Sequence, residues 1–138
     1  MGLERFVAAQ EHSFDRALDE VRNGRKETHW MWFIFPQIVG LGISDTAMYY
    51  SIESIGEAKL YLEHEVLGPR LVKITKELLS LETDDPIEIF GDIDAMKLNS
   101  CMTLFDYISD DNNDFYEVID KFYDGVKDEK TLQLIKKW

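Results

Sequence analysis

The clearest pattern in the sequence is an apolar stripe with helical spacing near the middle of the chain. It runs through Leu67, Leu71, Ile74, Leu78 and Leu81, in alternating steps of four and three residues. Side chains spaced in this way share one face of an α-helix, which turns once in about 3.6 residues. The stripe therefore predicts an amphipathic helix whose apolar face is covered by other elements, and it favours a helical fold.

Shorter stripes and capping residues predict further helices before this segment. Apolar side chains recur at three- and four-residue steps over 3–22, which indicates a first helix that ends at an Asn-Gly pair. Ser44 can cap a helix over 44–52. Ser54, followed three residues later by a glutamate, has the spacing of a capping box for a helix over 54–62.

The second half of the chain carries the same kinds of signal. A proline at a first helical position predicts a short turn over 85–91, and apolar stripes predict helices over 98–108 and 114–125. A last helix is expected over 128–138. We therefore expect an all-α fold: a compact single-domain bundle of about six to eight helices, several of them short, over residues 1–138.

The charge balance argues against two classes of partner. The chain has 15 Lys and Arg against 27 Asp and Glu, so its formal net charge is −12 at neutral pH. Such a chain repels both the phosphates of nucleic acids and anionic membrane surfaces. Neither a nucleic acid nor a membrane is therefore expected as a partner.

Other features of the composition indicate the compartment. The apolar run at residues 30–36 is far shorter than the roughly 20 residues that a bilayer crossing needs. The amino terminus lacks the pattern of a signal peptide, and the single cysteine, Cys101, cannot form an internal disulfide. These features together lead us to expect a cytoplasmic protein.

Several segments of fixed spacing match a known family. They are KETHWMWFIFPQ at 26–37, GLGIS at 40–44, and shorter matches at 57–62, 67–71, 89–97 and 100–105. In this order they resemble domain-of-unknown-function family 1810 over roughly residues 3–108. The resemblance implies a compact single-domain all-α fold in cytoplasmic proteins and no established activity. Members are sometimes labelled calpastatin-like, but no inhibitor repeat in this chain supports that label.

Two regions depart from the family pattern. His64-Glu65 stands where the family usually has His-Pro, which loosens the turn at that point. Residues 109–138 lie where the family is variable, so the C-terminal helices are expected from their own residues and not from the resemblance.

The aromatic segment at 26–37 is the first candidate for a binding site. Lys26 and His29 lie three residues apart, so on one helix they could meet the same anion. Trp30 or Trp32 would pack against the flat part of a ligand, and Gln37 adds a side-chain amide.

Two structural explanations compete with this interpretation. A buried core helix would use both tryptophans for packing alone. The short apolar run at 29–35 also fits a small hairpin, in which Trp30, Trp32 and Ile34 would share one face of the sheet.

A glycine-rich loop follows the aromatic segment. Gly40 and Gly42 lead into the helix capped by Ser44, and free N–H groups at such a helix start can hold a carboxylate or a phosphate. The loop matches neither the dinucleotide-binding fingerprint nor the P-loop. A plain turn with a serine cap is the competing interpretation.

A polar stripe near residue 100 is the third candidate. Lys97, Ser100 and Thr103 are three residues apart and offer an ammonium group and two hydroxyls on one side of a helix. They lie in the segment that carries the family resemblance, which supports a ligand-facing role, whereas a solvated helix face is the alternative. Cys101, among apolar neighbours, is expected to be a small buried side chain and not a nucleophile.

Metal sites and cofactors are not expected. Asp110, Asn112 and Asp114 begin like a calcium loop, but Phe115 stands where that loop needs glycine. The three histidines are too far apart for a local zinc motif.

Taken together, these residues predict a binding domain for a small anionic, nucleotide-like ligand at the HWMWFIFPQ and GLGIS segments. One alternative is an enzyme that uses the same site, with His29 as general acid or base. Another is a protein-interaction module that docks through aromatic residues of the tail, namely Phe115, Tyr116, Phe122, Tyr123 and Trp138.

Overall fold

The apolar stripe of the sequence forms α6 (Leu67–Leu79). The side chains of its stripe within the helix are all buried, namely Leu67, Leu71, Ile74 and Leu78. Helix α6 lies against α2 (Phe14–Arg22), α5 (Ile55–Glu63) and α8 (Asp114–Tyr123). The predicted amphipathic helix is therefore confirmed.

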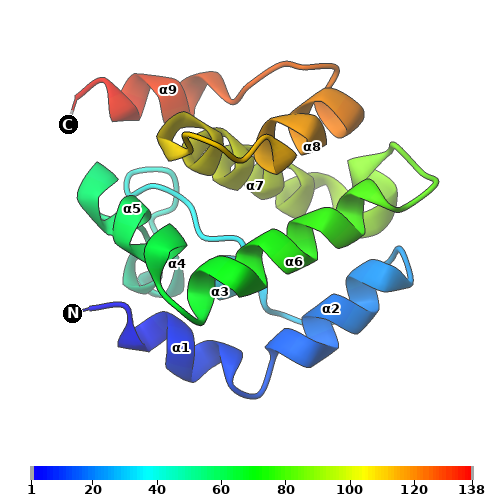
Figure 1. Ribbon diagram of the computed structural model, residues 1–138, viewed down its shortest axis with the longest axis horizontal. Helices are drawn as coiled ribbons and strands as arrows, with labels where there is room; N and C mark the ends of the chain where they lie inside the picture. Colours follow the sequence, from blue (N-terminus) through cyan, green and yellow to red (C-terminus); the bar gives the residue numbers. More distant parts are fainter. Residues whose placement is uncertain (1, 138) are drawn as a thin grey trace.

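The structure is a computed structural model that describes residues 2–137, and it is all-α as expected (Figure 1). The helices before α6 are α1 (Glu4–Gln10), α2 (Phe14–Arg22), α3 (Met31–Ile34), α4 (Asp45–Tyr49) and α5 (Ile55–Glu63). Those after it are α7 (Pro86–Ile108), α8 (Asp114–Tyr123) and α9 (Glu129–Ile135). The buried apolar side chains of this part of the chain form one connected core.

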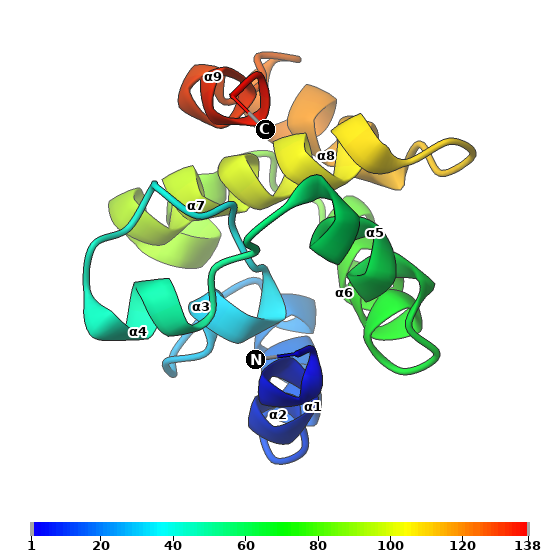
Figure 2. The same ribbon diagram turned by 90° about the vertical axis from the view of Figure 1, so that its left-hand side faces the viewer.

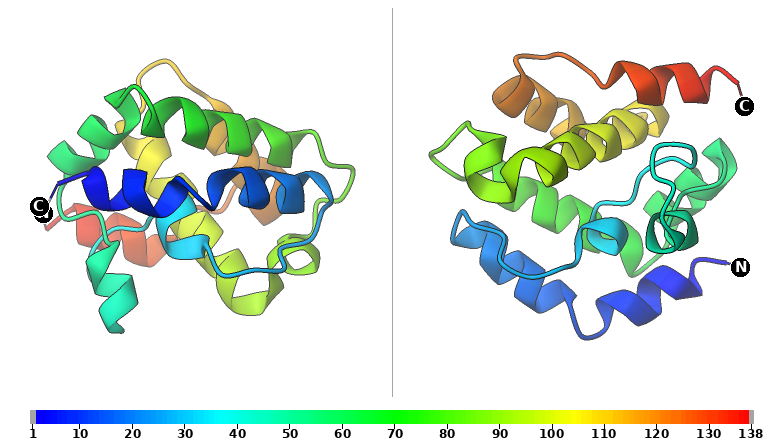
Figure 3. Two further views of the ribbon diagram at one scale, coloured as in Figure 1. Left: turned by 90° about the horizontal axis from the view of Figure 1, so that it is seen from below. Right: turned by 180° about the vertical axis from the view of Figure 1, so that it is seen from behind.

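The helices lie in a simple order across the molecule. In Figure 1, α1 and α2 form one edge, α3 and α6 follow, and α7 with α8 lies beyond them. Helix α9 is outermost and packs on α7, as the view from behind in Figure 3 also shows. The loop between α3 and α4 approaches α7 on the side seen in Figure 2. This arrangement brings the aromatic segment, the glycine-rich loop and the polar stripe to one region.

The predicted capping residues form the caps expected of them. The Ser44 hydroxyl accepts a hydrogen bond from the Ala47 N–H, and the Ser54 hydroxyl accepts one from the Glu57 N–H. Carboxylates do the same at the starts of α7 and α9, where Asp85 and Asp128 accept from the first turn. Local hydrogen bonding therefore sets where these helices begin.

The predicted helix over 3–22 is wrong in one respect, because the chain breaks between α1 and α2. On a straight helix, side chains eight positions apart point about 80° away from each other. Phe6 and Phe14 have this spacing, and both are buried in the core. The break lets both rings face that core. It also buries Gln10, whose amide donates to the Phe33 carbonyl and to the Tyr61 hydroxyl.

The ambiguous run at 29–35 forms the single-turn helix α3 and not a hairpin. Among residues 2–137 the backbone pairing is limited to one isolated parallel bridge, between Ile38 and Ile52. Two hydrogen bonds make it: the Ile52 N–H donates to the Gln37 carbonyl (2.8 Å) and the Val39 N–H donates to the Ile52 carbonyl (2.9 Å). Helix α4 therefore ends at Tyr49, earlier than the predicted 44–52 helix, because Ile52 is in an extended backbone conformation and pairs with Ile38.

Helix α7 joins two predicted elements. Gly91 has φ of +81°, a conformation that side chains other than glycine rarely adopt, and it separates the first turn from the rest. The chain resumes its helix at once, so the stripe predicted over 98–108 begins several residues earlier. Helices α8 and α9 lie where they were predicted, although Trp138 is outside the described residues.

Candidate functional site

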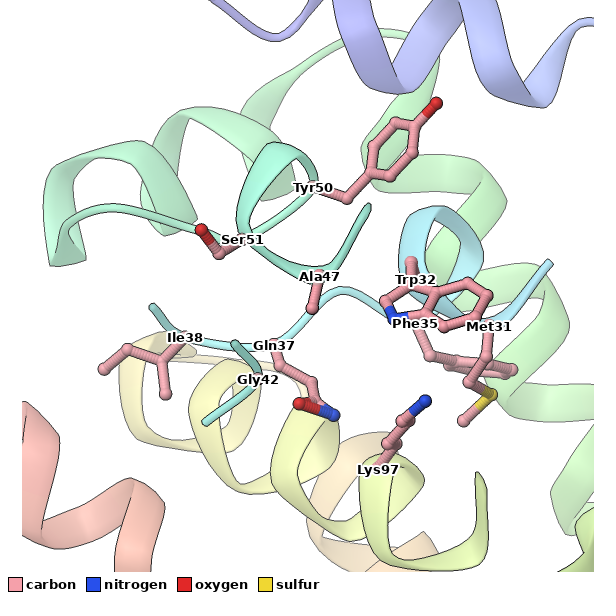
Figure 4. Close-up of a pocket in the computed structure, with 10 residues that line it drawn as sticks. All are labelled: Met31, Trp32, Phe35, Gln37, Ile38, Gly42, Ala47, Tyr50, Ser51 and Lys97. Atoms are coloured by element: carbon pink, nitrogen blue, oxygen red, sulfur yellow. The ribbon is translucent and has the colours of Figure 1, made fainter. Parts of the chain in front are cut away.

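The three candidate segments line one cleft, which we call the Trp32 cleft. It has a volume of about 560 Å³. One wall comes from the region before and within α4, namely Trp32, Gln37, Leu41, Gly42, Ile43, Ser44 and Ala47. The other comes from α7 and the start of α9, namely Ile93, Met96, Lys97, Ser100, Asp128 and Lys130. A narrow recess of about 20 Å³ continues from the cleft toward Met31 and Tyr50 (Figure 4).

Trp32 and Lys97 form the centre of this cleft. The Lys97 ammonium nitrogen lies 4.3 Å from the centre of the Trp32 ring, a cation–π distance. The side chains of Gln37 and Lys97 both extend toward the space beside that ring (Figure 4). The centre of the cleft therefore combines an aromatic surface, an amide and a cation.

A carboxylate is shared between this cation and a second one. Asp94 Oδ1 lies 3.5 Å from Lys97 Nζ, and Asp94 Oδ2 lies 3.0 Å from Lys26 Nζ. Lys26 in turn lies over Trp30, 5.1 Å from the ring centre. Two ammonium groups thus share one carboxylate, which leaves this cluster with a net charge of +1.

The glycine-rich loop lines the cleft through two of its predicted residues. A Cβ on Gly42 would lie 2.6 Å from the Ala47 Cβ, so only glycine allows the loop to pass this close to α4. The hydroxyl of Ser44 caps α4 and also borders the cleft. Gly40 does not line the cleft and lies instead against Leu134 of α9.

Besides Gly40, four of the predicted site residues lie outside the lining of the cleft. Lys26 reaches it only through Asp94, and His29 is exposed elsewhere. Trp30 is buried in the core. Thr103 is buried as well; its hydroxyl donates to Asn99 Oδ1 and accepts from the N–H of Asp128, which positions the start of α9.

Glu20, which binds the Trp30 indole, was not among the predicted site residues. The buried Glu20 carboxylate accepts hydrogen bonds from the N–H groups of Glu27 and Thr28, from the Thr28 hydroxyl and, at 2.9 Å, from Trp30 Nε1. Burial raises the pKa of Glu20, but these four hydrogen bonds outweigh it and lower that pKa from 4.5 to about 2. One signal was available, since Glu20 follows Ala17 by three residues and so lies on the buried face of α2.

Sequence analysis also missed several lining residues. Ile93 and Met96 share the helix face of Lys97 and Ser100, and that spacing was readable from the sequence. Asp94 was visible only as part of the family resemblance. Asp128 and Lys130 come from α9, whose position on α7 has no signal in the local sequence.

The aromatic residues of the tail mostly build the core. Phe115 and Phe122 are buried, and the Tyr123 hydroxyl donates to the Ala95 carbonyl. Tyr116 is partly exposed, and Trp138 lies outside the described residues. The four that the structure describes therefore do not gather into an exposed docking patch.

The described residues offer no cluster for a metal ion, because no three His, Cys, Asp or Glu side chains within residues 2–137 are suitably grouped. Cys101 is fully buried, and burial raises the pKa of its thiol well above the usual value. The thiol is therefore protonated near neutral pH, which fits the expected small buried side chain.

Comparison with known proteins places the chain in a family. Residues 1–135 match the family described as "Protein of unknown function (DUF1810)", which extends the resemblance through the C-terminal helices. The crystal structure of the conserved hypothetical protein Rv1873 from Mycobacterium tuberculosis is similar, with 45% sequence identity and a TM-score of 0.95 over 97% of this chain and 96% of that chain. No curated protein matches the sequence. None of the helices between residues 2 and 137 is both long and apolar enough to cross a membrane. The chain therefore belongs to the DUF1810 family of proteins of unknown function.

Proposed function

We propose that this protein binds a small anionic, nucleotide-like ligand in the Trp32 cleft. The observation that carries the proposal is the cluster of Lys26, Asp94 and Lys97 beside the Trp32 ring. The chain has a net charge of −12, yet this cluster has two ammonium groups and one carboxylate and so a net charge of +1. A cation held in a cleft, partly shielded from water, attracts an anion more strongly than the same cation on an open surface.

The geometry of Lys97 leaves it able to bind. An ammonium group has three N–H donors, and its 3.5 Å separation from Asp94 is too long for a strong hydrogen bond. The Trp32 ring attracts the ammonium charge through its π face and forms no conventional hydrogen bond with it. Lys97 can therefore donate to an anion without first losing a well-formed partner.

The rest of the cleft suits a ligand of this kind. Its volume of about 560 Å³ lies within the range of roughly 300–1,000 Å³ typical of small-molecule sites. Gln37 supplies an amide next to Lys97, and Trp32 supplies a flat surface. Lys130 adds a second cation at the α9 side of the cleft.

A matched pair of probes tests the proposal. AMP and adenosine differ only in the phosphate, so calorimetric titration with each measures how much binding depends on the anion. We expect AMP to bind at least about tenfold more tightly, a difference of about 1.4 kcal/mol. We expect Lys97→Met to remove most of that difference.

Lys136→Met is the matched control, because Lys136 is an exposed lysine that follows α9 and does not line the cleft. It should keep the preference for AMP. Adenosine binding as tightly as AMP, or an unchanged preference in a folded Lys97→Met protein, would contradict the proposal. The absence of AMP binding at millimolar concentration would contradict it as well.

A further inference from the structure

We infer that the ligand of the Trp32 cleft is amphipathic, with an aromatic or branched apolar group at one end and its anionic group at the other. This inference rests on the proposed function and adds to it the second half of the ligand. It follows from the order in which side chains line the cleft, from the exposure of its apolar residues, and from the position of its cations.

Along one face of α7, the side chains that line the cleft change from apolar to polar. Ile93, Met96, Lys97 and Ser100 have the spacing i, i+3, i+4 and i+7, and all four line the same wall. At 1.5 Å per residue, this face extends about 10 Å. Its first two residues are apolar and its last two are polar, so the wall changes character over the length of a small ligand.

The apolar end is exposed to solvent. Ile93 and Met96 are each 70% exposed, and Ile43, from the loop before α4, is 91% exposed. Large exposed apolar side chains that line one cleft from two separate elements are typical of a binding surface. A ligand that covered them would gain the favourable free energy of removing apolar area from water.

The polar end carries the cations. Lys97 lies there on α7, and Lys130 borders the cleft from α9. Asp128 also lines the cleft. One oxygen of its carboxylate accepts from the N–H and the hydroxyl of Thr131, and its charge offsets one of the two cations. The anionic group is therefore expected near Lys97 and Lys130, away from Ile93.

Ligands with only one of the two characters fit this wall less well. A purely polar anion such as a sugar phosphate would leave Ile93 and Met96 in water. A neutral apolar molecule would cover Lys97 and remove its ammonium group from water without a compensating charge. An amphipathic ligand satisfies both ends at once.

A second matched pair tests this inference. AMP and ribose 5-phosphate share the sugar and the phosphate, and only AMP has the aromatic base. We expect calorimetry to show AMP binding at least tenfold more tightly than ribose 5-phosphate. We expect Ile93→Ser and Met96→Ser to bring the two affinities within about threefold of each other, by weakening AMP alone.

The control is Ile87→Ser, in the same helix at an isoleucine that is 53% exposed and does not line the cleft. It should keep the full preference for AMP. All three positions are exposed, so thermal melting should show folded proteins with melting temperatures near that of the wild type.

The outcomes separate the inference from the proposed function. Equal binding of AMP and ribose 5-phosphate, both weakened by Lys97→Met, would overturn the amphipathic ligand and leave the anion site standing. Adenosine binding as tightly as AMP would instead overturn the proposed function. A preference for AMP that survives in Ile93→Ser and Met96→Ser would place the base elsewhere and overturn the inference. The absence of binding by all three probes would overturn both.

Discussion

Trp30 and Trp32 stand two residues apart, yet each belongs to a different part of the molecule. Trp30 is buried, and its indole N–H donates to a carboxylate, Glu20, that has three further donors. Trp32 lies at the cleft with the Lys97 ammonium over its ring. Between the two rings, Lys26 and Lys97 share Asp94.

The difference lies in how completely each carboxylate is satisfied. Glu20 accepts four hydrogen bonds from neutral groups and keeps its own charge, so it fixes the chain around Trp30. Asp94 faces two cations and cannot neutralise both. A fully satisfied buried group stabilises a fold, whereas a surplus charge beside a cleft is available to a ligand.

The strongest test of this contrast replaces each tryptophan in turn. Trp30→Ala should lower the free energy of unfolding by about 4 kcal/mol, because it leaves a cavity and removes a donor from Glu20. Trp32→Ala should lower it by only about 1 kcal/mol and should weaken AMP binding at least tenfold. Urea unfolding and calorimetry measure the two effects, and equal losses of stability would break the comparison.

Glu20→Gln should have the next largest effect, a loss of about 3 kcal/mol, because the amide cannot replace a charged acceptor of several hydrogen bonds. Urea unfolding at pH 7 measures it. AMP binding by the folded fraction should not change. A loss of binding with little loss of stability would show that Glu20 contributes to ligand binding.

The same variant should change how stability depends on pH. The folded-state pKa of Glu20, about 2, lies below its ordinary value of 4.5. Its contribution is therefore fully present above pH 4.5 and is lost as the pH falls through 2. The wild-type protein should lose stability over this window, and Glu20→Gln should lose less.

Asp94→Asn tests the role of the carboxylate that Lys26 and Lys97 share. It leaves Lys26, whose side chain is 9% exposed, without its carboxylate, and it should cost about 1.5 kcal/mol of stability. The same change raises the positive charge at the cleft, so AMP should bind several-fold more tightly. Asp92→Asn, at an exposed aspartate of the same helix, should change neither quantity. Weaker AMP binding in Asp94→Asn would show that Asp94 is needed to position Lys97.

His29→Ala should have the smallest effect. The side chain is exposed and does not line the cleft, so the free energy of unfolding should change by less than about 0.5 kcal/mol. Calorimetry with AMP should show the wild-type affinity. A tenfold loss would return His29 to the binding site and extend that site beyond the cleft.

The parts of the fold that were predictable depend on neighbours in the sequence. The stripe of α6 and the caps at Ser44 and Ser54 are set by spacing and by local hydrogen bonds. The break between α1 and α2 occurs where Gln10 contacts Phe33 and Tyr61, residues distant in the sequence. No local sequence pattern predicts such contacts, so the sequence alone predicted one continuous helix.

The site divides in the same way. The aromatic segment, the glycine-rich loop and Lys97 were recognisable as residues with suitable chemistry. Which tryptophan faces the cleft depends on the orientation of α3, a single turn whose position is set by the elements around it. The pairing of Lys26 with Asp94 joins residues far apart in the chain, and it is visible only after folding.

Segment 39–51 forms part of the cleft wall, and two backbone hydrogen bonds join its ends. The Ile52 N–H donates to the Gln37 carbonyl, and the Val39 N–H donates to the Ile52 carbonyl. Helix α4 within this segment has no buried residue, and Arg5 holds the segment from α1 through the carbonyls of Tyr49 and Ser51. Besides these bonds, the segment contacts the core through Tyr50, whose ring centre lies 5.9 Å from that of Phe6 and 5.3 Å from that of Phe33. We expect the amide hydrogens of α4 to exchange with solvent through local opening, whereas the buried amides of α7 should exchange only when the whole protein unfolds. The wall of the cleft formed by 39–51 should therefore be less protected from exchange than the wall formed by α7.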